Sequence, residues 1–247
     1  MTVALIPARL KSSRLHNKPL IKIAGLPMVV RVLRNTLKSK KFKKVIVCAD
    51  DNRIIKVLKK YNHTGVLTSK KHRNGTERIA EVAKKNNSKI IIDVQCDSVF
   101  VNHKNLEKLV NFHKKNMHFD IVIPHINFEK PNDKSAVKLV VNKKNEIIYM
   151  SREDIPFSNN KKKILMKKHL DYISFKRDAL LKFINFKQTP LEVYEGIELL
   201  RAIENNLKVG TFKIKNDLFS VNTKKDLYNA IKILKAAKWN LKPLYSI

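Results

Sequence analysis

The chain has 247 residues and carries 52 Lys and Arg against 21 Asp and Glu, a formal net charge of +31 at pH 7. Hydrophobic residues make up 43% of the sequence, enough for a packed core, which excludes a chain that is disordered throughout. No apolar stretch approaches the roughly 18 residues of a membrane span, and no signal peptide pattern opens the sequence. Two cysteines, Cys48 and Cys96, are too few for a disulfide framework. We expect one folded domain over residues 1–247, in the cytoplasm and without membrane contact.

The positive charge comes mostly from lysine. Ten of the 52 cations are Arg and 42 are Lys, and the lysines are spread along the whole chain. Proteins that read base edges or hold phosphates with two parallel hydrogen bonds rely on Arg. We therefore interpret the lysines as solvated surface, and nucleic acid is not an expected partner. A basic nucleic-acid-binding module stays open as an alternative, because so strong a field attracts polyanions.

Short β-branched runs alternate with longer helical patterns through the first half of the chain. This order is typical of a parallel sheet covered by helices. The predicted strands are residues 3–7, 45–49, 65–67, 90–94 and 121–124. The predicted helices are residues 27–37, 52–61, 77–85 and 105–115, with apolar residues at helical spacing. Pro27 suits a first helical turn, and Asp51 can cap the helix that follows it.

The pattern changes after about residue 131. Strands are predicted at 137–141, 147–150, 171–175 and 209–214, and helices at 191–205 and 223–237. The last helix opens with Thr223 followed three residues later by Asp226, a short form of the capping box. The expected fold class is α/β, a Rossmann-like mostly parallel sheet flanked by helices, with a β-rich inserted lobe at approximately 131–190.

The loop from residue 8 to 19 is the first candidate for chemistry. It follows the first predicted strand, and ligands of open α/β sheets bind at the carboxyl ends of strands. The loop holds four cations, Arg9, Lys11, Arg14 and Lys18, and two serine hydroxyls. This set suits a triphosphate, although the Gly-x-x-x-x-Gly-Lys pattern of a P-loop is missing. On charge alone, a solvated basic turn is an equal alternative.

Two segments resemble one known family. Residues 6–20 read IPARLKSSRLHNKPL, followed by GLPM at 25–28, and residues 74–80 read NGTERIA. These segments resemble the CMP-ulosonate synthetases, and among them most closely the CMP-Kdo synthetases. The resemblance implies a nucleotidyltransferase that couples CTP to a 2-keto-3-deoxy sugar acid, Kdo or a close relative, and releases pyrophosphate. It also implies Mg²⁺ as cofactor, a homodimer built partly by the inserted lobe, and a place in lipopolysaccharide biosynthesis.

The resemblance assigns roles in the nucleotide site. Arg9, Arg14 and Lys18 would hold the phosphates and offset the charge on the leaving pyrophosphate. Gly75 would let the backbone approach the nucleotide closely. The other implied nucleotide contacts are Ala8, Ser13, Arg73, Asn74, Thr76, Arg78 and Gln95. For Arg78 and its neighbour Glu77, an ordinary charged pair on an exposed first helical turn is the alternative.

The implied metal site departs from the family pattern. Asp97 follows the strand at 90–94, where a carboxylate can share Mg²⁺ with phosphate oxygens. Around it, Cys96 replaces Gly, Ser98 replaces Glu and Val99 replaces Pro. Asn222 stands where the second metal carboxylate is expected. An amide oxygen still coordinates Mg²⁺, but one negative charge is lost, so weaker metal affinity or a different metal dependence is expected.

The implied sugar site departs further. The predicted sugar contacts are Arg152, His169 and Glu195. For His169 a structural hydrogen bond is as good an interpretation. The family motif His-Leu-Gly-x-Tyr-Gly-Tyr continues here with Asp171 in place of its first Gly and Ile173 in place of its first Tyr, and Leu199 replaces a sugar-facing Gln. Because lost hydrogen bonds change substrate discrimination strongly, we expect an altered sugar preference. A degenerate paralogue that binds nucleotide without turnover remains the second hypothesis.

Overall fold

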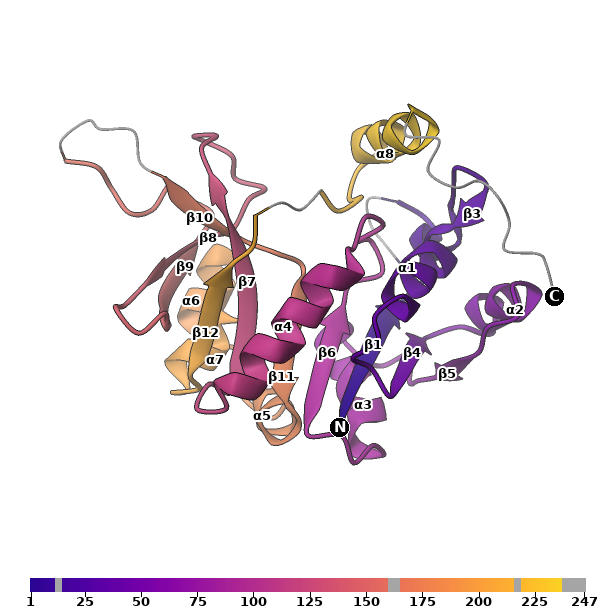
Figure 1. Cartoon of the computed structure of the whole chain (residues 1–247), viewed down its shortest axis with the longest axis horizontal. Helices are drawn as coiled ribbons and strands as arrows, with labels where there is room; N and C mark the ends of the chain where they lie inside the picture. The colour runs from indigo at the N-terminus through magenta and orange to yellow at the C-terminus, as the bar shows by residue number, and fades with distance from the viewer. Residues whose placement is uncertain (12–14, 160–164, 216–218, 237–247) are drawn as a thin grey trace.

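The computed structural model describes residues 1–11, 15–159, 165–215 and 219–236. One continuous sheet runs across the molecule, with helices on both of its faces (Figure 1). The strand order is β5-β4-β1-β6-β11-β7-β10-β8-β9, and β12 pairs with β7. This arrangement confirms the predicted α/β class with a Rossmann-like, mostly parallel sheet flanked by helices.

The first half of the chain builds the parallel part of the sheet. Strand β1 is buried along its whole length and pairs in parallel with β4 and β6, while β5 extends the sheet beyond β4. The bounds are β1 Thr2–Ala8, β4 Lys44–Ala49, β5 Gly65–Leu67 and β6 Ile90–Val94. All four match the predicted strands to within one residue. Cys48 and Cys96 are buried free thiols.

Four helices connect these strands and cover them. Their bounds are α1 Met28–Leu37, α2 Asn52–Lys60, α3 Gly75–Lys84 and α4 His103–Lys115. The apolar sides of α1, α2 and α4 share one core with one face of the sheet, and α3 packs in a second core on the opposite face. The cores therefore hold the sheet from both sides, as in other open α/β layers.

The ends of these helices follow from their capping residues. Asp51 caps α2 as predicted, and its carboxylate accepts a hydrogen bond from the backbone N–H of Arg53 at 2.8 Å. Helix α3 begins two residues earlier than predicted because the Asn74 side chain accepts from the Glu77 N–H at 2.9 Å. Pro27 lies outside the first turn of α1, in extended backbone at the end of a short strand, which corrects the predicted position.

The second half adds antiparallel strands to the same sheet. The bounds are β7 Ile121–Phe128, β8 Lys138–Val141, β9 Ile147–Ser151, β10 Met166–His169 and β11 Tyr172–Lys176. Strand β11 lies between β6 and β7 and is antiparallel to both, with Ser174 opposite Ile92 on one side and Val122 on the other. Strand β10 and the helix α5, Arg177–Phe183, were not predicted. Residues 131–159 and 165–190 thus continue the sheet, and their assignment to a sugar-binding and dimerisation lobe stays a prediction.

One predicted helix is wrong. The helix expected at 191–205 is two short helices, α6 Pro190–Glu195 and α7 Leu200–Glu204. The break lies at Gly196, whose φ of +60° is the left-handed conformation that ends helices and that glycine adopts without steric cost. Helical spacing of apolar residues continues across the break, so the pattern concealed it.

Short elements complete the fold around the site. They are η1 Lys18–Leu20, β2 Lys22–Ile23, β3 Leu26–Pro27, β12 Val209–Lys213 and α8 Lys224–Ala236. Strand β12 is parallel to β7. The predicted capping box opens α8, since the Asp226 carboxylate accepts from the Thr223 N–H at 2.8 Å and the Thr223 hydroxyl accepts from the Asp226 N–H at 3.2 Å. The Ala237 end of the predicted helix lies outside the described residues.

Of the five glycines, Gly210 in β12 leaves the least room for a side chain. A Cβ there would lie 2.4 Å from Cδ2 of the buried Phe119 ring. We expect Gly210→Ala to lower the free energy of unfolding by about 1–3 kcal/mol, because the ring must shift in a packed core. Urea denaturation measures this change. Adding Phe119→Leu should recover part of the loss, and a double variant less stable than the sum of the two single changes would contradict the explanation.

Candidate active site

Three predicted residues from distant parts of the chain meet at the carboxyl edge of the sheet. The ammonium of Lys18, on η1, lies 2.6 Å from Asp97 Oδ2 and donates to Asn222 Oδ1 at 3.1 Å. Asp97 follows β6, and Asn222 precedes α8. The backbone holds this meeting in place, because the Val221 N–H donates to the carbonyl of Asp97 at 3.0 Å.

This arrangement fits a hard divalent cation. The oxygens of Asp97 and Asn222 converge on one cationic group, the Lys18 ammonium. Among the described residues there is no cluster of three or more His, Cys, Asp or Glu side chains that would hold a metal alone. Mg²⁺ in enzymes of phosphate chemistry commonly takes one or two protein carboxylates and completes its shell with water and substrate phosphates. The donor set at this edge therefore suits Mg²⁺ bound together with a nucleotide.

The charge of Asp97 depends on its surroundings. Burial raises the pKa of the Asp97 carboxyl, the Lys18 ammonium lowers it, and the carboxylate of Asp171 raises it again. The Lys18 and Asp97 side chains are only 16% and 20% exposed, so water screens their attraction weakly. A cation brought to Asp97 consequently meets an anion that is held in a fixed position and poorly solvated.

The loop after β1 is described only in part. Ala8 is buried at the end of β1. Arg9 is exposed, and its guanidinium donates to the carbonyl of Arg73 at 3.2 Å, which ties this loop to the start of α3. Ser13 and Arg14 lie outside the described residues, so their predicted roles are not placed.

The start of α3 forms the wall beside this loop. A Cβ at Gly75 would lie 3.1 Å from Cγ of Pro7 and 3.5 Å from Nε2 of Gln95, so the backbone passes close to β1. The Asn74 amide donates to Glu198 Oε1 at 2.9 Å, and the Thr76 hydroxyl donates to Glu198 Oε2 at 3.0 Å. Glu198 was not among the predicted site residues, because only the break at Gly196 turns it toward α3.

Arg73 and Arg78, two further predicted nucleotide contacts, also have protein partners. Arg73 pairs with the Glu77 carboxylate at 2.6 Å. Arg78 is 2% exposed, and its guanidinium donates to the Thr68 hydroxyl at 2.7 Å and to the Ser69 carbonyl at 3.0 Å. Arg78 is therefore buried, and the alternative that Arg78 and Glu77 form a charged pair on an exposed first helical turn is wrong. Its contact with a nucleotide stays a prediction.

A cavity of about 250 Å³ opens next to these residues. The cavity is lined in one part by Gly75, Thr76 and Gln95, which were predicted to contact the nucleotide. Another part is lined by Arg152 and His169, which were predicted to contact the sugar. The other lining residues are Asp93, Val137, Met150, Asp171, Ile173, Gly196, Ile197, Glu198 and Leu199. Ile173 and Leu199 thus present apolar side chains to the cavity, at the two positions where the sequence predicted lost hydrogen bonds.

Glu195 holds Arg152 in place. The Glu195 carboxylate accepts from the Tyr149 hydroxyl at 3.0 Å, the Ser151 hydroxyl at 2.6 Å and the Arg152 backbone N–H at 2.9 Å. The Arg152 guanidinium donates to the carbonyls of Glu195 and Gly196 at 3.0 and 3.3 Å. Glu195 does not line the cavity as Arg152 does, and its direct contact with a sugar stays a prediction.

Several titratable groups lie around the cavity. Asp93 is 1% exposed, and its Oδ2 accepts from the Gln95 amide at 2.8 Å. Burial raises the pKa of Asp93, and the nearby carboxylate of Glu198 raises it further. Burial lowers the pKa of His169, which favours the neutral imidazole. Nδ1 of His169 is buried and has no hydrogen-bond partner within the described residues.

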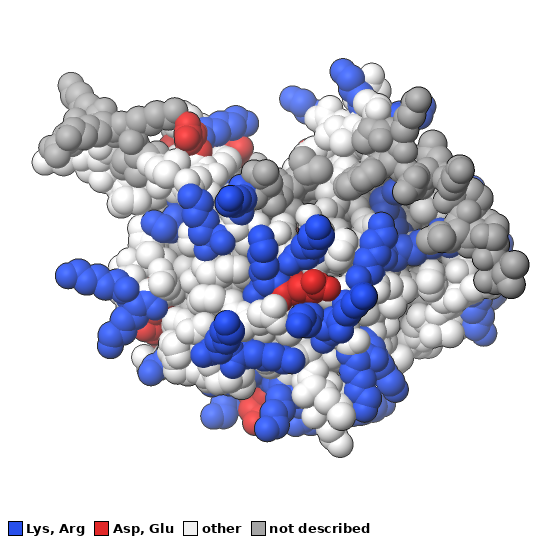
Figure 2. All heavy atoms as spheres, viewed as in Figure 1, with Lys and Arg blue, Asp and Glu red and all other residues white. Residues whose placement is uncertain are grey.

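The exposed surface carries most of the positive charge. On the face drawn in Figure 2, Lys and Arg side chains are spread over the surface with uncharged areas between them. Helix α4 and the outer strands contribute to this face (Figure 1). In the described part of the chain, no helix is both long and apolar enough to cross a membrane.

Comparison with known proteins identifies the family. The profile of the cytidylyltransferase family matches residues 3–212. The chain belongs to the cytidylyltransferase family. A 3-deoxy-manno-octulosonate cytidylyltransferase of Fusobacterium nucleatum is 33% identical, with 94% of this chain and 96% of the relative covered. One of Rickettsia prowazekii is 35% identical, with 94% of each covered.

Two solved structures share the fold of this chain. The structure of CMP:2-keto-3-deoxy-manno-octonic acid synthetase complexed with CTP superimposes with a TM-score of 0.92 and 27% identity, over 96% of this chain and 99% of that one. The bifunctional IspDF of Campylobacter jejuni shares the fold at a TM-score of 0.62 and 16% identity, over 92% of this chain and 53% of that one. This cytidylyltransferase is accordingly a nucleotidyltransferase enzyme.

Proposed function

We propose that this cytidylyltransferase couples CTP to a 2-keto-3-deoxy sugar acid, Kdo or a close relative, and forms a CMP-sugar and pyrophosphate. The observation that carries the proposal is the meeting of Lys18, Asp97 and Asn222 at the sheet edge, beside a cavity of about 250 Å³. The 3-deoxy-manno-octulosonate cytidylyltransferases that are 33% and 35% identical to this chain support the same substrates. CTP binding by the 27% identical solved structure supports the nucleotide.

The geometry divides the work between two sides of the cavity. On one side, Lys18 and Arg9 bring positive charge to the phosphates, and Gly75 leaves room for the nucleotide next to β1. Asp97 and Asn222 would hold Mg²⁺, which offsets charge on the phosphate oxygens when bound. On the other side, Arg152 offers its remaining N–H donors to the sugar carboxylate, and His169 offers an unpaired ring nitrogen.

The reaction is an in-line displacement. The anomeric oxygen of the sugar acid forms a bond to the α-phosphorus of CTP, while the bond from that phosphorus to pyrophosphate breaks. The hydroxyl proton passes to water. The protein contributes by positioning the two substrates and by stabilising charge, as in other phosphoryl and nucleotidyl transfers.

A pyrophosphate-release screen tests the proposal. CTP, UTP and ATP are each incubated with a panel of ulosonic acids and Mg²⁺. Release is expected only with CTP and a sugar acid together, and it is expected to stop when EDTA removes the metal. Because Ile173 and Leu199 face the cavity, the preferred acid should be one that does not need hydrogen bonds from those two positions. The proposal fails if every acid leaves CTP intact at high Mg²⁺.

The degenerate-paralogue hypothesis predicts a different result in the same screen. CTP would bind, but no sugar acid would react. The Leu199→Gln variant would then release pyrophosphate although the wild type does not. If activity is already present, Leu199→Gln should instead change which acid is preferred. The homodimer, the cytoplasmic location and the place in lipopolysaccharide biosynthesis stay predictions that rest on the family.

A further inference from the structure

Carboxylates gather at one place in a chain that is otherwise strongly basic. Asp93, Asp97, Asp171 and Glu198 surround the junction of the cavity with the sheet edge. Asp97 pairs with Lys18, and Glu198 pairs with Arg201 at 3.1 Å. Within the described residues, neither Asp93 nor Asp171 has a Lys, Arg or His partner at ion-pair distance. With 52 cations against 21 acids in the chain, an acid such as Asp171 that has no protein cation beside it indicates a site for a bound cation.

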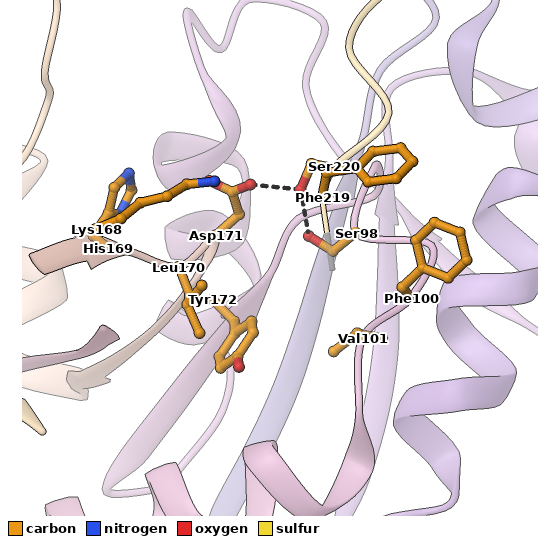
Figure 3. Close-up of a pocket in the computed structure, with 10 residues that line it drawn as sticks. All are labelled: Ser98, Phe100, Val101, Lys168, His169, Leu170, Asp171, Tyr172, Phe219 and Ser220. Carbon is orange, nitrogen blue, oxygen red and sulfur yellow. Dashed lines mark hydrogen bonds between the residues drawn. The ribbon is translucent and has the colours of Figure 1, made fainter. Parts of the chain in front are cut away.

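Asp171 belongs to the same structural unit as Asp97 and Asn222. It lies in the turn between β10 and β11, and its carboxylate accepts a hydrogen bond from the Ser220 hydroxyl, as Figure 3 shows. The Ser220 hydroxyl also lies 3.4 Å from that of Ser98, the residue after Asp97. Ser220 is two residues from Asn222. The hydrogen bonds therefore join the three segments that carry Asp97, Asp171 and Asn222.

A second observation points to a ligand at the same junction. Asp93 is 1% exposed and lines the cavity together with Asp171. Its Oδ1 atom is buried and has no hydrogen-bond partner among the described residues. A buried carboxylate oxygen without a partner is costly, so such an atom normally faces a group that completes it. Nothing in the described chain completes Asp93, whereas a hydrated cation held between Asp97 and Asp171 would bring water donors to it.

We propose that Asp171 is the second carboxylate of the divalent-cation site, where it supplies the negative charge that the Asn222 amide lacks. The inference rests on the proposed function for the nucleotide that shares the cation. Hard cations favour carboxylate over amide oxygens because the charge adds to the attraction. The sequence agrees with this proposal. Compared with the family pattern, Asn222 replaces a carboxylate and removes one negative charge, whereas Asp171 replaces a Gly and adds one.

Mn²⁺ binding in the presence of CTP, without sugar, measures the contribution of Asp171. The loss of the free Mn²⁺ signal in electron paramagnetic resonance, beyond the loss that CTP causes without protein, gives the affinity. Asp171→Asn should weaken Mn²⁺ binding at least about tenfold, the equivalent of ~1.4 kcal/mol. The variant keeps an oxygen that can accept from Ser220, so its thermal midpoint should stay near that of the wild type.

Two further variants sharpen the test. Asp178→Asn removes one charge from a side chain that is 86% exposed on α5, and it should change Mn²⁺ affinity less than twofold. Asn222→Asp added to Asp171→Asn should restore the affinity to within about threefold of the wild type, because the site regains two carboxylates. The proposal is overturned if Asp171→Asn binds Mn²⁺ as the wild type does, if the wild type binds none, or if Asn222→Asp does not compensate.

This outcome is separate from that of the proposed function. Wild-type pyrophosphate release with an unchanged Mn²⁺ affinity in Asp171→Asn would reject the role of Asp171 and keep the enzyme assignment. Mn²⁺ binding with CTP that depends on Asp171, but no pyrophosphate release with any ulosonic acid, would keep the role of Asp171 and reject the enzyme assignment.

Discussion

Replacing Asp97 by Asn is expected to lower the rate of pyrophosphate release by about 10³-fold. The carboxylate of Asp97 lies 2.6 Å from the Lys18 ammonium, and in the proposed function it would hold the Mg²⁺ that offsets charge on the phosphates. Without its charge, the cation is bound weakly and the developing charge on pyrophosphate loses part of its stabilisation, a change typically worth several kcal/mol in the transition state. Initial rates with CTP at saturating sugar acid measure the effect.

The Asp97→Asn variant should fold normally. Its side chain has the same shape, and its carbonyl oxygen can still accept the hydrogen bond from Lys18. Asp178→Asn again serves as the charge-matched control and should keep the wild-type rate. If Asp97→Asn retains more than a tenth of the wild-type rate with an unchanged thermal midpoint, Asp97 does not hold the cation.

Replacing Arg201 by Met is expected to lower the free energy of unfolding by about 3–5 kcal/mol. Arg201 is 1% exposed, and its guanidinium lies 3.3 Å from Glu192 Oε2 and 3.1 Å from Glu198 Oε1. It also lies over the Phe183 ring at 4.5 Å. Removing it leaves the buried carboxylate of Glu192 without a cation, and an uncompensated buried charge is among the most destabilising changes. Chemical denaturation at neutral pH gives the value.

The same variant should also affect the cavity. The Glu198 carboxylate accepts hydrogen bonds from Arg201 on one side and from Asn74 and Thr76, at the start of α3, on the other. Losing Arg201 removes the first of these contacts and lets the carboxylate move. Arg53→Met is the control, because its pair with Asp51 is on the surface and should contribute little. A loss of stability below about 1 kcal/mol for Arg201→Met would contradict the explanation that this variant leaves a buried charge without its partner.

Local pattern was sufficient for much of the fold. The apolar runs of β1 and β6 and the helical spacing in α1 and α4 gave elements in the right places, since each depends on its own segment. The approach of Lys18 to Asp97 also followed from a general rule. Parallel strands share one carboxyl edge, so loops that follow β1 and β6 meet there whatever their separation in sequence.

The missed features depend on distant parts of the chain. No local signal states that β11 inserts between β6 and β7, because its partners lie about 80 and 50 residues earlier. The break at Gly196 was concealed by apolar spacing that continues from Leu191 to Ile203. That break turns Glu198 toward Asn74, so an error in one helix also removed a residue from the predicted site.

The insertion of β11 sets the order in which the protein can be completed. On a ribosome, β6 emerges long before Tyr172–Lys176, and until then the edge of β6 that later pairs with β11 keeps a row of unpaired N–H and C=O groups. The nascent chain must therefore shield an open seam in the middle of its sheet during synthesis. Because the partners of β11 lie far away in the sequence, we expect the closing of the sheet to be slow.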